Sequence, residues 1–199
     1  AALPDRYVPA DTVVAVLPCL YTAGKHSEKD AAELTELANS RLADAFASRG
    51  FKVADPAAVS RALERLNIDL KDEEQQKRET LYRVGDELKA RLVAFFVITD
   101  VDARVTGTFF AANKEGRARV KAWLVDAGSK EPVFSATTVE GKAKKIAVAG
   151  VKATARMREA VVKSVETAYV KPFLVNYEDR KPGPRDAEAA PKDGNPVGK

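Results

Sequence analysis

Cysteine and histidine each occur once in this chain, and the two residues, Cys19 and His26, stand seven positions apart. A thiol beside an imidazole can form the nucleophile and base of a thiol enzyme. Cys19 directly follows the apolar run 12–18, and active sites in α/β folds favour the ends of buried strands. However, no third group that would orient the imidazole is evident, and His26 falls in an expected loop. The sequence therefore favours Cys19 as a small, half-buried apolar residue over a catalytic one.

Two other roles for Cys19 are also disfavoured. A lipid-modified cysteine follows a small residue and an apolar segment behind a basic start, whereas Pro18 precedes Cys19 and no such start is present. A lipid-bearing cysteine upstream of Ala1 stays open. Zinc sites need several closely spaced cysteine and histidine ligands, and this sequence offers two such residues in all.

Sequence motifs of common enzymes and nucleotide-binding proteins are missing. The chain has no G-x-G-x-x-G, Walker, H-E-x-x-H or G-x-S-x-G pattern. Asp100 and Asp102 lie two apart at a strand end, where a carboxylate pair can bind a cation but more often only solvates the strand. Asp126 is typical of a turn. We therefore expect no catalytic residue, no cofactor, no metal site and no enzymatic activity.

Composition and length indicate one globular domain. The chain has 199 residues, of which 45% are hydrophobic, and no run of 18 apolar residues would span a membrane. The start at Ala1 fits a trimmed chain or a mature protein whose signal peptide has been removed, and we favour the second. We expect an N-terminal extension over 1–10, an α/β domain over 11–176, and an extended or disordered tail rich in proline and glycine over 177–199.

The first half of the chain alternates strands and helices. The continuous apolar run 12–18 is typical of a strand buried on both faces. Ser27 has the type and spacing of a helix cap, and Arg49-Gly50 ends the apolar stripe that follows. A short strand is expected at 51–54, and Asp55-Pro56 then marks the start of another helix.

The second half predicts a meander of strands and a long final helix. The stretch 92–99 is the most apolar in the chain and predicts the central strand. A hairpin connection is expected over 106–115, strands over 117–125 and 132–139, and a helix over 147–169. Together these elements predict a mixed central β-sheet flanked by helices.

Several short stretches, in this order and spacing, resemble bacterial envelope proteins of the CsgG and TolB N-terminal-domain type. The resemblance covers about residues 11–170, and Cys19 stands where phenylalanine is common in that family. The matching stretches are VAVLP at 14–18, RGFKVADP at 49–56, GDELKARLV at 85–93, LVDAGSK at 124–130 and VFS at 133–135.

The resemblance implies an exported protein of the periplasm or outer membrane that is not an enzyme. Such proteins act as subunits of oligomers or of larger envelope complexes, by contact with other envelope proteins or with copies of themselves. The sequence lacks a second domain of propeller type, so the resemblance extends only to the α/β domain.

Candidate contact residues come from two features of the sequence. Adjacent aromatic residues at Phe109 and Phe110 are difficult to bury together, and exposed aromatic side chains mark contact surfaces. Residues 141–185 carry eleven lysine or arginine residues against four acidic ones, which suits an anionic neighbour, although a solvated helix face is also consistent with this pattern. The candidates are Phe109, Phe110, Lys142, Lys144, Lys145, Arg156, Arg158 and Tyr177.

A module that binds an anionic ligand or polyanion is the alternative function. Nucleic acid is not an expected partner, because the basic residues are not interleaved with aromatic ones and no nucleic-acid motif is present.

Overall fold

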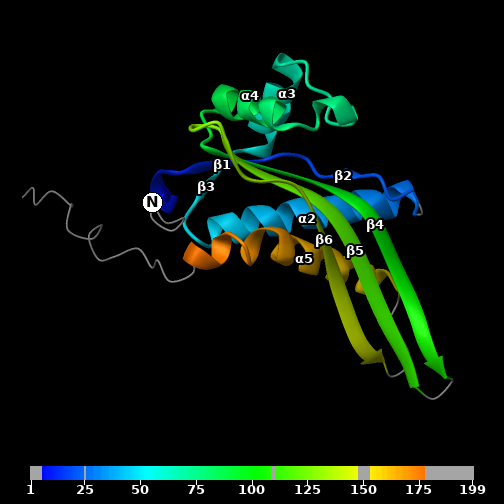
Figure 1. Cartoon of the computed structure of the whole chain (residues 1–199). Coiled ribbons are helices and arrows are strands. Elements are labelled where there is room, and N and C mark those ends of the chain that lie inside the picture. The colour runs from blue at the N-terminus through cyan, green and yellow to red at the C-terminus, as the bar shows by residue number, and fades with distance from the viewer. Residues whose placement is uncertain (1–5, 25, 109–110, 148–152, 178–199) are drawn as a thin grey trace, which may run out of the picture.

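The computed structural model describes residues 6–24, 26–108, 111–147 and 153–177. The chain is an α/β protein with a six-stranded mixed sheet in the order β3-β1-β4-β5-β6, and β2 lies beside β4 (Figure 1). β1 is parallel to β3 and β4, whereas β4, β5 and β6 form an antiparallel meander. The strands are β1 (Val13–Val16), β2 (Leu20–Tyr21), β3 (Lys52–Val53), β4 (Leu92–Thr108), β5 (Ala111–Asp126) and β6 (Glu131–Ala147). The α-helices are α2 (Glu28–Ala47), α3 (Pro56–Arg65), α4 (Arg78–Leu88) and α5 (Ala153–Val165). Single turns of other helix types cover Pro9–Asp11, Glu73–Gln75, Glu166–Val170 and Leu174–Tyr177.

Helix ends follow the local sequence signals. The Ser27 side chain accepts a hydrogen bond from the Asp30 backbone N–H at the start of α2, and the Asp55 side chain accepts one from the Ala57 N–H at the start of α3. Gly50 adopts a φ of 84° after α2, in the left-handed region that glycine enters without strain. These observations confirm the expected caps and the expected end of the first helix.

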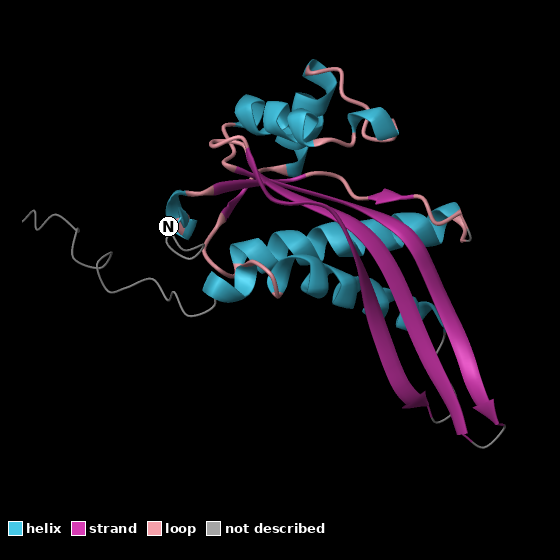
Figure 2. Cartoon of the chain, viewed as in Figure 1, coloured by secondary structure: helices cyan, strands magenta, loops and turns pink. Residues whose placement is uncertain are grey.

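Helices cover the two faces of the sheet unequally. α2 and α5 lie along one face, and α3 and α4 lie over the other face at one end only (Figures 1 and 2). Alternate residues of β4 divide between the two layers: Phe96 joins the cluster with α2 and α5, and Phe95 joins the cluster with α3 and α4. This end of the sheet is therefore the core of the domain.

α5 packs directly onto the backbone of β5 and β6. A Cβ atom added at Gly116 would lie 2.2 Å from the Arg156 carbonyl oxygen, and one added at Gly141 would lie 2.2 Å from the Ala160 carbonyl oxygen. Any larger residue at either position would push the helix away from the strands, so these two glycines set the distance between the layers.

The strands of the meander are longer than the sequence indicates. The expected hairpin connection over 106–115 is wrong, because β4 continues to Thr108 and β5 begins at Ala111. The expected helix from 147 is also wrong at its start, because β6 continues to Ala147 and α5 begins at Ala153. Cross-strand pairing explains the difference: Ala112 pairs with Gly107 on one side and with Ala147 on the other, and such pairing overrides local preference.

Two tyrosines near the ends of the described chain belong to the core. Tyr7, within the expected N-terminal extension, is fully buried, and its hydroxyl donates to the Asp126 carboxylate at 2.9 Å. Tyr177 is also buried and packs on Phe51 and Phe173 with ring centroids 5.2 and 5.3 Å apart. Both ends of the described chain are therefore tied to the same end of the sheet.

Within the described ranges, no helix combines the length and apolarity needed to cross a membrane.

Candidate interaction surface

Cys19 and His26 do not form a reaction centre. The Cys19 thiol is buried and directed at the Leu20 carbonyl oxygen at 3.4 Å, and burial raises the pKa of the thiol well above its ordinary value. A thiol that holds its proton is a poor nucleophile. The His26 Nε2 atom lies 3.0 Å from the Val101 carbonyl oxygen, and its ring meets Tyr21 edge-on. Each residue is thus engaged in local packing.

The acidic residues singled out in the sequence have structural partners, and the expected position of Asp100 and Asp102 at a strand end is wrong, because both lie inside β4. Among the residues described, no three histidine, cysteine or acidic side chains are grouped as metal ligands. The Asp102 carboxylate pairs with the Arg104 guanidinium at 2.7 Å. The Asp126 carboxylate accepts hydrogen bonds from the backbone N–H groups of Gly128 and Ser129 at 3.0 and 3.1 Å, which confirms its place in a turn.

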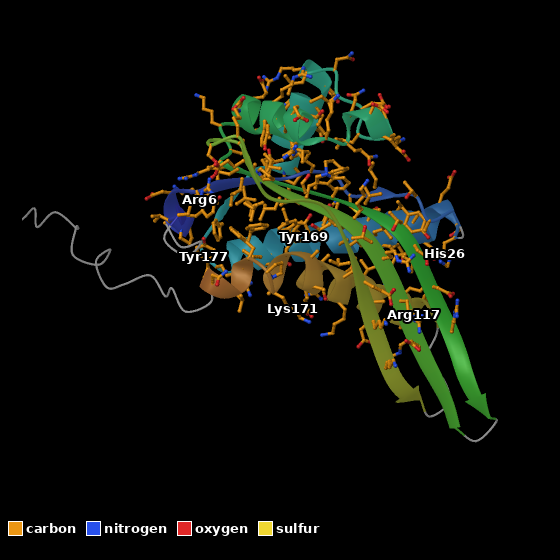
Figure 3. The ribbon with its side chains drawn as sticks, viewed as in Figure 1. Arg6, His26, Arg117, Tyr169, Lys171 and Tyr177 are labelled. Carbon is orange, nitrogen blue, oxygen red and sulfur yellow. The ribbon has the colours of Figure 1, made fainter. Side chains whose placement is uncertain are left out.

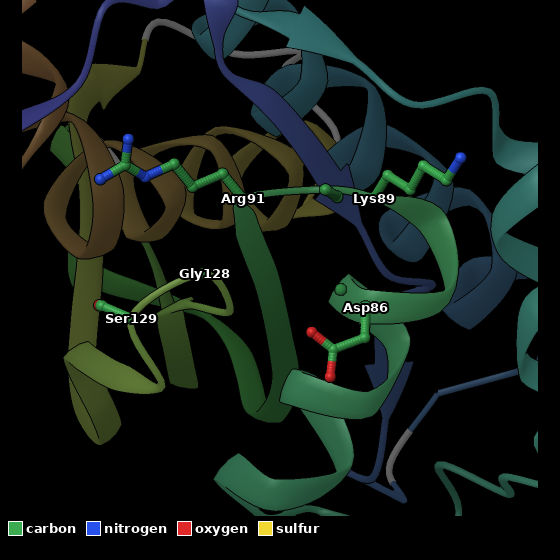
Figure 4. A pocket seen from close by; sticks show the side chains of 7 residues that line it. Asp86, Lys89, Arg91, Gly128 and Ser129 are labelled. Atoms are coloured by element: carbon green, nitrogen blue, oxygen red, sulfur yellow. The ribbon is translucent and has the colours of Figure 1, made fainter.

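A hollow of about 590 Å³ opens between the end of α4 and the β5–β6 turn (Figure 4). The Arg91 guanidinium, at its edge, lies 5.0 Å from the centroid of the Tyr7 ring and has its Nε atom 3.6 Å from the buried Asp126 carboxylate. The Lys130 ammonium pairs with the Asp86 carboxylate. Two of the cations around the hollow are therefore paired with carboxylates, and the Arg91 contacts tie the N-terminal segment to the turn. The lining residues are Gly85, Asp86, Lys89, Ala90, Arg91, Gly128 and Ser129.

The outer part of the meander exposes a sheet face that carries charged residues in rows. Val101, Ala118 and Ala143 face α2 and α5 in the buried cluster, so the residues that alternate with them lie on the opposite face. The strand register places nine of these residues in three rows, and we call this surface the open face. The rows are Asp100, Arg119 and Glu140; Asp102, Arg117 and Lys142; and Arg104, Glu115 and Lys144.

Ion pairs link the rows and strands of the open face. Glu140 lies 3.5 Å from the Arg119 guanidinium and 3.1 Å from the Lys142 ammonium, and these cations lower the pKa of its carboxyl group. Glu115 likewise lies 3.2 Å from Arg117 and 3.9 Å from Lys144. Each of these glutamates is shared by two cations, whose side chains stay about half exposed or more. The open face therefore presents a fixed pattern of charges with a cationic surplus.

The structure divides the basic residues that the sequence groups together. Lys142 and Lys144 lie on the open face, whereas Arg158 lies on α5, on the other side of the sheet, and pairs with Glu33 of α2 at 3.2 Å. Arg156 is buried beside Gly116 and pairs with Glu159.

The remaining candidate contact residues do not form one surface in the described part of the chain either. Tyr177 is buried at the far end from Arg117 (Figure 3), so neither Tyr177 nor Arg156 offers its side chain to a partner in this structure. Lys145 pairs with Lys114 in the backbone register of β6 and β5. Phe109 and Phe110 lie outside the described residues. A contact role for each of the eight candidates stays a prediction.

Sequence reasoning missed most of the open face. The residues it did not single out as contacts are Asp100, Asp102, Arg104, Glu115, Arg117, Arg119 and Glu140. The available signal was the alternation of charged with small or apolar residues over 115–121 and 140–144, which is typical of a strand with one exposed face.

Neither a protein-family model nor a curated protein matches this chain. Among solved structures, lipoprotein GNA1162 from Neisseria meningitidis is similar with a TM-score of 0.43 at 14% identity, over 67% of this chain and 83% of that one. The LpoB C-terminal domain from Escherichia coli gives 0.41 at 19% identity, over 69% and 86%. A PelC dodecamer from Paraburkholderia phytofirmans gives 0.40 at 13% identity, over 83% and 90%. Likenesses of this size carry no function from those proteins to this chain.

Proposed function

We propose that this protein is a non-enzymatic subunit of an assembly in the bacterial envelope, in the periplasm or at the outer membrane, and that it binds other proteins or copies of itself. The sequence resemblance to envelope proteins supports the location. The protonated, buried thiol of Cys19 argues against a thiol enzyme. The observation that carries the proposal is the open face, a broad sheet surface that the described helices leave uncovered.

The charge pattern of the open face suits recognition better than stability. Exposed ion pairs contribute little to folding, typically about 0 to 1 kcal/mol each. A fixed arrangement of charges does select a partner with the complementary arrangement and rejects others, because a misplaced like charge is costly. The Arg119–Glu140 pair spans β5 and β6 in the innermost row of this pattern, on strands held in register by the rest of the sheet.

A charge swap tests the proposal without disturbing the fold. The double variant Arg119→Glu with Glu140→Arg keeps a cross-strand pair and the net charge but inverts the pattern that a partner meets. The matched control swaps the α3–α4 pair, Arg65→Glu with Glu87→Arg, which lies outside the open face and the candidate contact residues.

Native mass is measured by light scattering after gel filtration, for each protein alone and after mixing with a detergent extract of bacterial envelopes. We expect the wild type and the control to form an assembly of one discrete mass, and the open-face swap to stay monomeric. A wild type that stays monomeric in both conditions contradicts the proposal, and so does an open-face swap that assembles like the wild type.

A further inference from the structure

The strands of the meander end in a segment without charge. β4, β5 and β6 run past the helices to a free end (Figure 1), and the register there pairs Gly107 with Ala112 and Ala112 with Ala147. We call the described residues at this end, 105–108, 111–113 and 146–147, the distal end. None of them is acidic or basic.

A basic band lies directly behind the distal end. The register places Lys114 opposite Lys145, and Lys144 in the next row opposite Glu115. We define the basic band as residues 102–104, 114–117 and 142–145, which contain six lysine or arginine residues and two acidic ones. The rest of the chain has 27 of each sign, so the band accounts for the whole net charge of +4.

The boundary between the two zones is level to within one residue across the sheet. On β4 it falls between Arg104 and Val105, on β5 between Asn113 and Lys114, and on β6 between Lys145 and Ile146. The register pairs Lys114 with Lys145, so the change is level on β5 and β6, and it pairs Val105 with Lys114, so the change on β4 falls one residue farther from the strand tip. A planar change from cationic to uncharged matches a membrane surface, where anionic phosphates lie just outside an apolar interior.

We propose that the distal end docks on the surface of a membrane that contains anionic lipids, with the basic band at the level of the lipid phosphates. Each lysine or arginine near such a surface strengthens binding about fivefold, and the uncharged end enters the headgroup boundary at little cost. An acidic protein would satisfy the band but leaves the uncharged end without a role. Lipid docking and the protein contact proposed above are separable, because the two tests change different residues. Lys114 and Lys145 do not belong to the open face, and Arg119 and Glu140 do not belong to the basic band.

Vesicle flotation tests the inference. The full chain is mixed with vesicles of phosphatidylcholine alone or of phosphatidylcholine with phosphatidylglycerol, at low and high salt. We expect binding to the phosphatidylglycerol vesicles at low salt, with loss at high salt. Lys114→Glu with Lys145→Glu is expected to weaken this binding by at least about tenfold.

The control is Lys52→Glu with Lys171→Glu, which makes the same change in net charge at exposed positions on β3 and after α5. Lys171 lies far from the free strand ends (Figure 3). The control is expected to bind like the wild type. No binding of the wild type to the phosphatidylglycerol vesicles at low salt, or an equal loss in both variants, overturns the proposal.

An environment-sensitive fluorophore locates the contact directly. It is attached to Thr108→Cys at the distal end or to Ser60→Cys on α3, in a chain that carries Cys19→Ala. We expect a blue shift on vesicle binding from position 108 and none from position 60. Binding to polyglutamate as tight as to vesicles, with no shift from position 108, would assign the band to an acidic protein and overturn the proposal.

Discussion

The inner and outer parts of the same long strand meet different surroundings. On β4, residues 92–98 are buried on both faces, between α2 and α5 on one side and α3 and α4 on the other. From Asp100 to Arg104 only Val101 is buried and Ala103 is partly buried, because α3 and α4 do not extend over this part (Figure 2). One strand thus serves as core at one end and as displayed surface at the other. A protein can hold a charged sheet face rigid in this way, since the inner part fixes its register.

The largest difference between the two parts is expected for stability. Phe95→Ala removes a fully buried ring that packs on Trp123 at 5.1 Å, and the cavity should reduce the free energy of unfolding by about 4 kcal/mol. Arg104→Ala, farther along the same strand, should change it by less than about 0.5 kcal/mol. Urea denaturation followed by circular dichroism measures both. Equal losses would mean that the outer part is as important to folding as the core.

A second stability test concerns the contact of α5 with the meander. Gly141→Ala places a methyl group 2.2 Å from the Ala160 carbonyl oxygen and should cost about 3 kcal/mol. Gly128→Ala is the control, because its new methyl group lies 3.3 Å from the Asp126 carboxylate in an exposed turn, and it should cost about 1 kcal/mol or less. Thermal melting measures both variants. A Gly141→Ala protein as stable as the control would show that α5 is not seated on β6.

A third prediction uses the buried tyrosines of the inner part. Burial raises the pKa of Tyr7. It also raises the pKa of Tyr169, well above its ordinary value. A tyrosine in the unfolded chain loses its proton at about pH 10. Above that pH the unfolded chain binds fewer protons than the folded chain, so the free energy of unfolding falls. The contribution of these tyrosines to the free energy of unfolding should be complete below about pH 10 and should decrease as the pH rises further.

Variants assign this pH dependence. Tyr7→Phe should lessen the alkaline decrease, and at neutral pH it should cost about 1 to 2 kcal/mol, because the buried Asp126 carboxylate loses a hydrogen bond. Tyr82→Phe, on α4, is the comparison and should lessen the decrease by a smaller amount, since burial also raises the pKa of Tyr82 but its side chain is partly exposed. Urea denaturation across alkaline pH measures the effect. An unchanged slope in Tyr7→Phe would exclude Tyr7 as its source.

The smallest effect is expected for the open face. The swap Arg119→Glu with Glu140→Arg should shift the free energy of unfolding by less than about 0.5 kcal/mol, because both side chains are partly exposed and solvent screens them. Urea denaturation of the swapped protein checks this value. A loss of several kcal/mol would show that the rows hold the meander together, and would assign them a structural role.

Much of the inner part could be predicted from the sequence. The apolar run 12–18 contains β1, and the caps at Ser27 and Asp55 begin α2 and α3 as expected. These signals are local, because a cap or a buried strand is recognised within a few residues. The short strand β2 was missed, since two residues that pair with β4 leave no periodic signal.

The outer part was predicted less well. Thr106 to Glu115 was expected to be a connection, yet all of its described residues pair with β4, β5 or β6. Lys142 and Arg158 were grouped by their closeness in the sequence, yet a strand and a helix on opposite sides of the sheet carry them. Which face a charge lies on depends on strand register, and register depends on residues far away in the chain.

The sequence by itself determined the α/β class, the caps of two helices and the residues of the central strand, because those features follow from hydrophobic periodicity and short-range hydrogen bonds. Only the tertiary structure decided the length of β5 and β6, the burial of Tyr7 and Tyr177, and the rows of the open face. The physical reason is that each of these features depends on contacts between distant segments, such as α5 on Gly116 and Gly141 or Tyr7 on Asp126. Cross-strand register then aligns the charges of three strands.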